Sequence, residues 1–375
     1  MPNETYTEVL GFSVANDHPN CEAQQWLADR ISCLDLVSGI KNVWKHDLPN
    51  PVLTAVDEQD PGVQISLLKA CLERMNWHAA QPSDAEGIKD AHFYVGSLLY
   101  RTVCTLYQRD LPYSEHDICG ILTLSQHSCG HGSDVGPPFE IALAHARKNG
   151  ISDELLAALR TYLGGLKGTR SIQANQIKRK VNLLLVLQSG FEGKARPCWS
   201  DRFRKGLALV SQEEQQKWRE LVVSMTVNDA PTAPKKWHRR AKRFLSDVSA
   251  ATVIERLSAW WPDPRESTIW PIQTGGSHLL KYFIGLLSLI REAGTRTAEC
   301  DSLVCQLSEI GWKPRDRGQK VILAAVHYLL RCPPEVAGSP LERLESALSS
   351  EPDRKRAKAR ELLQSYRNEH DLRLA

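Results

Sequence analysis

Four residues that are able to bind a metal ion gather in one short part of the chain. His127, Cys129 and His131 alternate with other residues, and Cys119 lies a little earlier. Thiolate and neutral imidazole are good zinc ligands, and the intervening glycines would allow the tight turn that alternating ligands need. The spacing matches no familiar zinc motif, so a glycine-rich surface loop with polar histidines is the favoured interpretation. We therefore expect no bound cofactor.

A second candidate site is the strongly basic segment Lys235–Phe244, which reads KKWHRRAKRF. Its cations could contact phosphates while an aromatic ring stacks on a base, a combination typical of nucleic-acid binding. Helical periodicity, however, puts Trp237 on the apolar face, where a core position is favoured, and cationic runs are also common on solvated outer helices. The candidate nucleic-acid contacts are Lys178, Arg179, Lys180, Arg202, Arg204, Lys205, Lys235, Lys236, Arg239, Arg240 and Arg243.

Sequence patterns that indicate catalysis are missing. The chain contains no Gly-x-Ser-x-Gly, no phosphate-binding Gly-Lys-Ser/Thr loop and no His-Glu-x-x-His. The remaining enzymatic hypotheses are a metal-dependent enzyme that uses the His127 loop, and a HEAT-like DNA glycosylase with a catalytic Asp263 in the Trp260–Pro264 elbow. The two prolines of this elbow explain it more simply as a turn between helices. A non-enzymatic role is therefore favoured.

The elements that must position these residues are predicted to be helices. Apolar residues recur with helical spacing, and no segment alternates convincingly as a strand would, so we expect an all-α fold of about fifteen helices. Cys21–Trp44 is predicted to form one long helix that ends before Pro49 and Pro51, and a second helix is predicted at Gly62–Trp77. Residues 233–270 predict two amphipathic helices that fold back on each other.

The apolar faces of such helix pairs must be covered by similar pairs. This requirement favours a HEAT/armadillo-like helical-repeat array, an α-solenoid. Trp218 and Trp260 lie 42 residues apart, as do Trp270 and Trp312, and this is the length of one HEAT-type repeat.

The net charge of +3 hides a strong division along the chain. Residues 1–165 hold 11 Lys and Arg against 21 Asp and Glu, whereas the remaining residues hold 36 against 23. We therefore expect an acidic helical subdomain at 1–166 and a basic HEAT-like subdomain at 167–375, which meet at the glycine-rich segment Gly164–Arg170. Such asymmetry favours either two domains that attract each other or an acidic partner for the basic half.

The sequence shows no recognisable targeting or membrane segment. No stretch of about 18 apolar residues is present, and the N-terminal residues lack a basic segment followed by an apolar core. The ten cysteines occur without any Cys-x-x-Cys pair and are predicted to be reduced. We therefore expect a cytoplasmic protein that does not bind a membrane.

Five landmarks lie between residues 212 and 344: Lys236–Trp237, the Trp260–Pro262 elbow, the Gly275–Leu287 helix, Gly311–Trp312 and Arg317–Val321. They resemble a group of bacterial HEAT-like helical-repeat proteins of unknown function, related to molybdate-metabolism-regulator-like proteins. The resemblance implies a HEAT-like fold and names no catalytic residue. Members of that group usually continue into a further C-terminal domain, so activity in such a domain is not carried over.

Taken together, these patterns favour a non-enzymatic scaffold or interaction module that holds a partner protein between helix pairs. The alternative is a nucleic-acid-binding array that uses the basic C-terminal half. An enzyme, either metal-dependent or glycosylase-like, is the third hypothesis.

Overall fold

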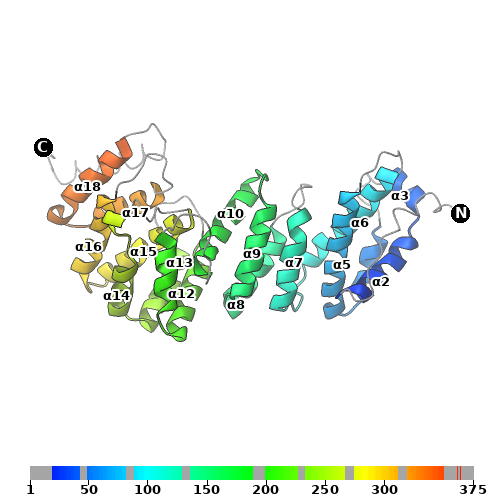
Figure 1. Cartoon of the computed structure of the whole chain (residues 1–375), viewed down its shortest axis with the longest axis horizontal. Helices are drawn as coiled ribbons and strands as arrows, with labels where there is room; N and C mark the ends of the chain where they lie inside the picture. The colour runs from blue at the N-terminus through cyan, green and yellow to red at the C-terminus, as the bar shows by residue number, and fades with distance from the viewer. Residues whose placement is uncertain are drawn as a thin grey trace. The chain divides into compact units, whose positions relative to one another are not determined.

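The protein is all-helical. The structure, a computed structural model, describes residues 19–42, 49–81, 88–128, 136–188, 199–226, 233–266, 274–310 and 319–349, together with Glu361 and Gln364. These residues form seventeen α-helices and three short 3-10 helices, and they contain no β-strand (Figure 1). The predicted all-α class is therefore confirmed. No helix in these ranges is both long enough and apolar enough to cross a membrane.

The helices group into two compact units. The described residues up to His145 form the first unit together with Ala157–Ile177, and Ala146–Leu156 belongs with the described residues from Lys178 onward. The chain therefore passes into the second unit at Ala146, returns to the first unit at Ala157 and passes into the second unit again at Lys178. The predicted boundary near residue 167 lies within the returning segment. At that point the chain makes a hydrogen-bonded turn in which the Thr169 amide donates to the carbonyl of Leu166, a fully buried residue.

The first helices differ from the prediction of one long helix over Cys21–Trp44. The helix α2 ends at Ser32, and α3 begins at Leu36 because Asp35 accepts a hydrogen bond from the Ser38 amide, 3.1 Å away, and so caps a new helix. The helices that follow are α4 (Pro51–Asp57), α5 (Pro61–Ala80), α6 (Ile88–Tyr107), α7 (Glu115–Ser128), α8 (Pro137–Asn149), α9 (Asp153–Gly165) and α10 (Ile172–Leu184).

The second unit continues in the same way and contains the basic segment. Its described helices after α10 are α11 (Trp199–Ala208), α12 (Gln212–Ser224), α13 (Lys235–Asp247), α14 (Ala250–Trp260), α15 (Thr274–Glu292), α16 (Thr297–Gln306), α17 (Gln319–Leu329) and α18 (Pro334–Ser349). The short 3-10 helices are η3 (Leu185–Leu187), η4 (Pro264–Glu266) and η5 (Leu307–Glu309). Consecutive helices contact each other, for example α12 and α13. Helices two apart in the chain, such as α15 and α17, are also in contact.

Aromatic rings form the centre of the second unit. Trp218 is fully buried, and its ring centroid lies 5.1 Å from that of Trp260 and 5.7 Å from that of Phe283. Phe203 packs edge-on against Trp260 at 5.3 Å. The 42-residue spacing of Trp218 and Trp260 therefore corresponds to a direct contact between α12 and α14. Trp270 and Trp312, the other pair with this spacing, lie outside the described residues.

Several contacts between helices join residues that are 42–48 positions apart in the sequence. In the second unit, Arg256 contacts Glu214 and the Trp261 indole donates to the carbonyl of Leu303, each across 42 residues. In the first unit, the Lys69 ammonium donates to Asp117 across 48 residues. Each contact joins chain positions that are about one helix pair apart.

Gly206 allows α11 to lie close to α14, which gives a first testable prediction. A Cβ atom at this position would lie 1.9 Å from the Trp260 Nε1 atom. Gly206→Ala is therefore expected to lower the free energy of unfolding by about 1–3 kcal/mol, measured by urea denaturation. Gly338→Ala in α18 is the control, because nothing lies within 4 Å of its Cβ position and alanine favours a helix. Equal stability of the two variants would contradict the proposed close approach.

Candidate anion-binding surface

The helix α13 presents a cationic face to solvent and an apolar face to the core. Trp237, Ala241 and Phe244 are buried at helical spacing, whereas the cations between them are exposed. None of these cations is paired with a carboxylate in the part of the chain that the structure describes. The six exposed cations, called here the α13 cations, are Lys235, Lys236, Arg239, Arg240, Lys242 and Arg243.

This arrangement of charge disfavours the helix itself. Like charges four residues apart, such as Lys235 and Arg239, repel each other by about 0.2–0.5 kcal/mol per pair. Lys235 and Lys236 also lie in the first turn, near the positive end of the helix dipole, and no acidic residue is present there. The buried face must offset these costs. A surface that repels itself in this way is relieved by a bound anion.

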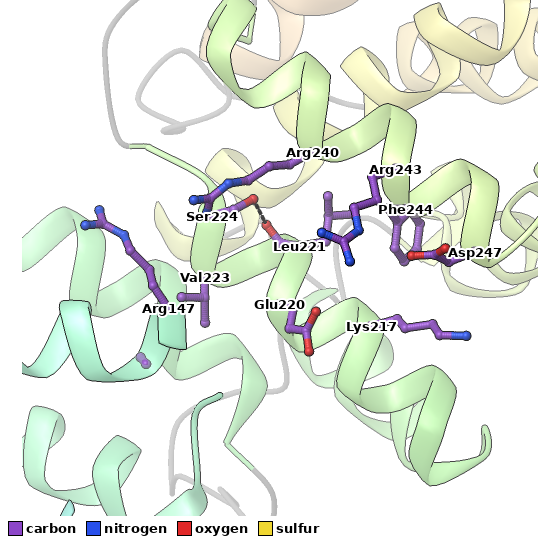
Figure 2. A pocket seen from close by; sticks show the side chains of 11 residues that line it. Arg147, Lys217, Glu220, Leu221, Val223, Ser224, Arg240, Arg243, Phe244 and Asp247 are labelled. Carbon is purple, nitrogen blue, oxygen red and sulfur yellow. Dashed lines mark hydrogen bonds between the residues drawn. The ribbon is translucent and has the colours of Figure 1, made fainter. Parts of the chain in front are cut away.

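Two of the α13 cations reach a pocket between α13 and α12. Arg240 and Arg243 extend from α13 toward α12, where Ser224, Leu221 and Glu220 lie (Figure 2). The pocket has a volume of about 300 Å³, and all of its lining residues belong to the second unit. We call it the α12–α13 pocket. It is lined by Ala146, Arg147, Lys217, Glu220, Leu221, Val223, Ser224, Arg240, Arg243, Phe244 and Asp247.

The pocket is cationic but also contains carboxylates. Arg147, Arg240 and Arg243 make no ion pair with any described residue. The Lys217 ammonium is held 2.7 Å from the Glu213 carboxylate, so it is already compensated. Glu220 accepts a hydrogen bond from the Gln216 side chain at 3.1 Å. Three uncompensated guanidinium groups therefore share the pocket with two carboxylates, those of Glu220 and Asp247.

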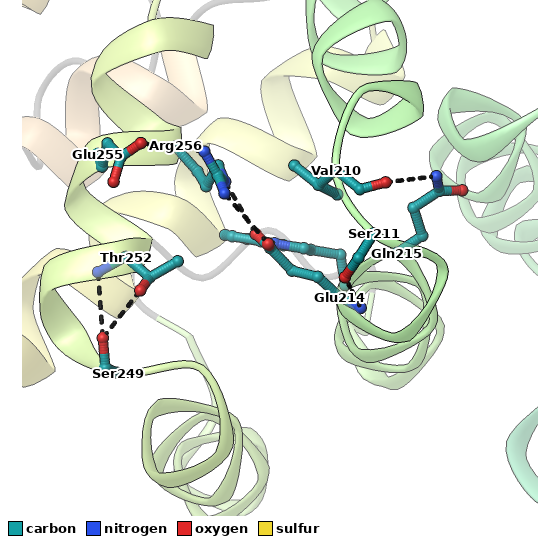
Figure 3. A network of polar contacts seen from close by, with 9 residues as sticks. Val210, Ser211, Glu214, Gln215, Ser249, Thr252, Glu255 and Arg256 are labelled. Atoms are coloured by element: carbon teal, nitrogen blue, oxygen red, sulfur yellow. Dashed lines mark hydrogen bonds and ion pairs between the residues drawn. The ribbon is translucent and has the colours of Figure 1, made fainter.

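A polar network joins α12, which also lines the pocket, to α14 (Figure 3). The Arg256 guanidinium donates from Nε to Glu214 Oε1 at 3.0 Å and from Nη2 to Oε2 at 3.3 Å. Glu214 also accepts from the Trp218 indole at 3.3 Å, and its amide donates to the Ser211 hydroxyl that caps α12. Hydrogen bonding to Glu214 raises the pKa of Arg256. The wall of the pocket that α12 provides is therefore held in place.

Other predicted nucleic-acid contacts have structural partners instead. The buried Lys180 ammonium donates to the carbonyls of Val223, at 2.9 Å, and of Met225, and so satisfies the end of α12. Arg202 donates to the carbonyl of Ala259 at 3.3 Å.

Arg204 is engaged in a similar way. It donates to the carbonyl of Leu185 at 3.3 Å and pairs with Asp201. Lys178 and Arg179 lie half-buried on α10, and Lys205 is exposed on α11. Of the eleven cations predicted from the sequence, only Arg240 and Arg243 line the α12–α13 pocket.

The predicted metal ligands are only partly described. Cys119 is buried in α7. His127 belongs to the same helix, but its side chain lies outside the described residues, as do Cys129 and His131 altogether. The described residues contain no group of three or more His, Cys, Asp or Glu side chains that could hold a metal ion. The metal hypothesis therefore stays a prediction.

Asp263 in the Trp260–Pro264 elbow acts as a turn residue. Its Oδ1 atom accepts from the Arg265 amide at 2.9 Å and from Arg265 Nε at 3.1 Å. These hydrogen bonds hold the pKa of the Asp263 carboxyl below its ordinary value. The two contacts account for an aspartate at this position without a catalytic role.

Comparison with known proteins adds no family to this description. No protein-family model, curated protein or solved structure matches the chain.

Proposed function

We propose that the protein is a non-enzymatic helical-repeat scaffold. Contacts across 42 or 43 residues support a repeat of one helix pair in the second unit: Glu214 with Arg256, Trp261 with Leu303 and Arg331 with Ser288. This separation agrees with the length of a HEAT-type repeat. Arrays of this kind use extended surfaces to bind partners, and each repeat contacts mainly its neighbours.

The partner that we propose is nucleic acid, bound through the α13 cations. The observation that carries this proposal is that six exposed cations on one helix have no carboxylate partner among the described residues. A nucleic-acid backbone supplies closely spaced phosphates, and their neutralisation by Lys and Arg releases condensed counterions. Such binding requires no particular shape beyond a continuous cationic face.

An acidic partner protein is the competing interpretation of the same charge. Protein interfaces usually include an apolar or aromatic anchor at their centre. Among the described residues, the exposed large hydrophobic side chains are Val63, Phe93, Ile172 and Leu209, and none of them lies on α13. The exposed face of α13 therefore lacks the anchor that a protein partner would need, which favours a phosphate backbone.

The proposal is tested by removing three α13 cations that do not line the pocket, in the variant Lys235→Gln, Lys236→Gln, Arg239→Gln. Binding to labelled duplex and single-stranded oligonucleotides is measured by fluorescence anisotropy. Exposed ion pairs contribute about 0.2–1 kcal/mol each, so losing three phosphate contacts should weaken binding by about tenfold.

A charge-matched variant of the first unit separates this effect from a loss of net charge. Lys89, Lys167 and Arg170 are exposed, and changing all three to glutamine removes the same charge. This variant is expected to bind as the unaltered protein does. Undetectable binding by the unaltered protein at low salt, or equal weakening in both variants, would overturn the nucleic-acid proposal and leave an acidic protein as the partner to test.

A further inference from the structure

We infer that the α12–α13 pocket binds a small phosphorylated molecule that also carries hydroxyl groups, of the nucleotide or sugar-phosphate class. The inference does not depend on nucleic-acid binding by the rest of α13. It rests on three features of the pocket: uncompensated arginines, carboxylates and an apolar wall.

The arginines provide the phosphate contacts. Arg240 and Arg243 lie one turn apart on α13, and Arg147 enters from the last turn of α8. None of the three is paired with a carboxylate in the described parts of the chain. A guanidinium group presents its N–H donors as a planar fork that matches phosphate oxygens, and it stays charged at every physiological pH. The pocket therefore holds three guanidinium groups that can bind phosphate and that form no ion pair with a described residue.

The carboxylates select the rest of the ligand. Glu220 and Asp247 line the same pocket as the arginines. They would repel an isolated phosphate ion, but they can accept hydrogen bonds from hydroxyl groups attached to a phosphorylated molecule. A ligand with a phosphate at one end and hydroxyl donors nearby satisfies both sets of charges. Inorganic phosphate satisfies only the arginines.

The remaining lining is apolar and limits the size of the ligand. Phe244, Leu221, Val223 and Ala146 are buried residues that contribute to the wall. The volume of about 300 Å³ lies at the lower end of the range for small-molecule sites. An apolar wall beside polar groups suits a sugar or base face. The size and the lining therefore favour a molecule such as a mononucleotide.

The test is calorimetric titration of the full chain with AMP, ribose 5-phosphate, adenosine and inorganic phosphate. We expect AMP or ribose 5-phosphate to bind, and adenosine and inorganic phosphate to bind at least about tenfold more weakly, because each lacks half of the recognised groups. Binding of none of the four, or equal binding of AMP and inorganic phosphate, would overturn the inference.

Two variants on the same helix provide the matched comparison. Arg243→Gln removes one pocket guanidinium and is expected to weaken binding of the phosphorylated ligand about ten- to a hundredfold. Lys242→Gln removes an exposed cation of α13 that does not line the pocket, and it is expected to leave the affinity unchanged. Both positions are exposed, so both variants should fold, which circular dichroism verifies. Equal loss of affinity in the two variants would contradict a specific pocket.

A nucleic-acid end could present the same phosphate group as a small molecule. Oligonucleotides with a 5′-phosphate and with a 5′-hydroxyl distinguish the two sources. Binding of the 5′-phosphorylated strand without binding of AMP would overturn the small-molecule inference. The variant Lys235→Gln, Lys236→Gln, Arg239→Gln should bind AMP with the affinity of the unaltered protein. AMP binding by the pocket is therefore tested independently of nucleic-acid binding by α13.

Discussion

The affinity of the protein for duplex DNA is expected to fall about 10³-fold as the salt concentration rises from about 50 mM to about 200 mM. The logarithm of the binding constant falls with the logarithm of salt by about 0.9 per phosphate neutralised, so six contacts give a slope of about −5. The six α13 cations are the basis of this number, since none of them is compensated by a described carboxylate. Anisotropy titrations at four or more salt concentrations measure the slope.

The same salt titration, repeated on variants, identifies which cations contact phosphates. Removing Lys235, Lys236 and Arg239 together should reduce the steepness of the slope by about 3, because each lost phosphate contact changes it by about 1. The first-unit control variant should keep the full slope. A slope near zero for the unaltered protein would show that phosphate contacts do not supply the binding energy, and would remove the argument for nucleic acid.

Sequence patterns predict the beginning of a helix well when both residues of the capping hydrogen bonds are close together in the sequence. Ser114 and Asp117 have the three-residue spacing of a capping pair, and they cap the beginning of α7 reciprocally: the Asp117 amide donates to the Ser114 hydroxyl at 3.1 Å, and the Ser114 amide donates to Asp117 at 3.2 Å. The similar pair Ser211 and Glu214 completes only half of this arrangement. The Glu214 carboxylate is instead drawn to Arg256, 42 residues further along the chain.

Proline marks a helix boundary without saying which helix it belongs to. The helical segment expected to end before Pro49 and Pro51 does end before them, at Asn42, but Pro51 also begins α4, because the side chain of Asn50 accepts from the Leu53 amide at 3.1 Å and caps the helix. The Asn50 side chain also donates to the carbonyl of Leu98 at 2.9 Å. That long-range contact fixes the cap, and no local pattern contains it.

The cationic face of α13 could be predicted, but the pocket could not. The 3.6-residue period alone places Trp237 and Phe244 inward and the cations outward. The pocket also needs Arg147, which lies far from α13 in the sequence. The sequence likewise counts Lys180 as one more cation, whereas its burial under the end of α12 is a tertiary property. Charge is visible in a sequence, but its accessibility depends on packing.

Replacing Trp218 with alanine is expected to lower the free energy of unfolding of the second unit by about 3–5 kcal/mol. The side chain is fully buried, and its ring centroid lies 4.7 Å from that of Phe244 and 5.1 Å from that of Trp260. Alanine removes these aromatic contacts and leaves a cavity that rigid neighbouring helices cannot fill. It also leaves Glu214 without one of its hydrogen-bond donors.

The chain has two units, so a single denaturation midpoint would not locate this effect. Hydrogen exchange measured by mass spectrometry resolves it by peptide. Faster exchange is expected in α12, α13 and α14, with unchanged exchange in α5 and α6 of the first unit. Leu209→Ala is the control, because this side chain is 87% exposed and its loss should change stability by less than about 0.5 kcal/mol. Unchanged exchange in α12–α14 would show that the aromatic cluster does not hold these helices together. Phe244, which contacts Trp218, also lines the α12–α13 pocket, so Trp218→Ala should in addition weaken AMP binding although it removes no charged residue of the pocket.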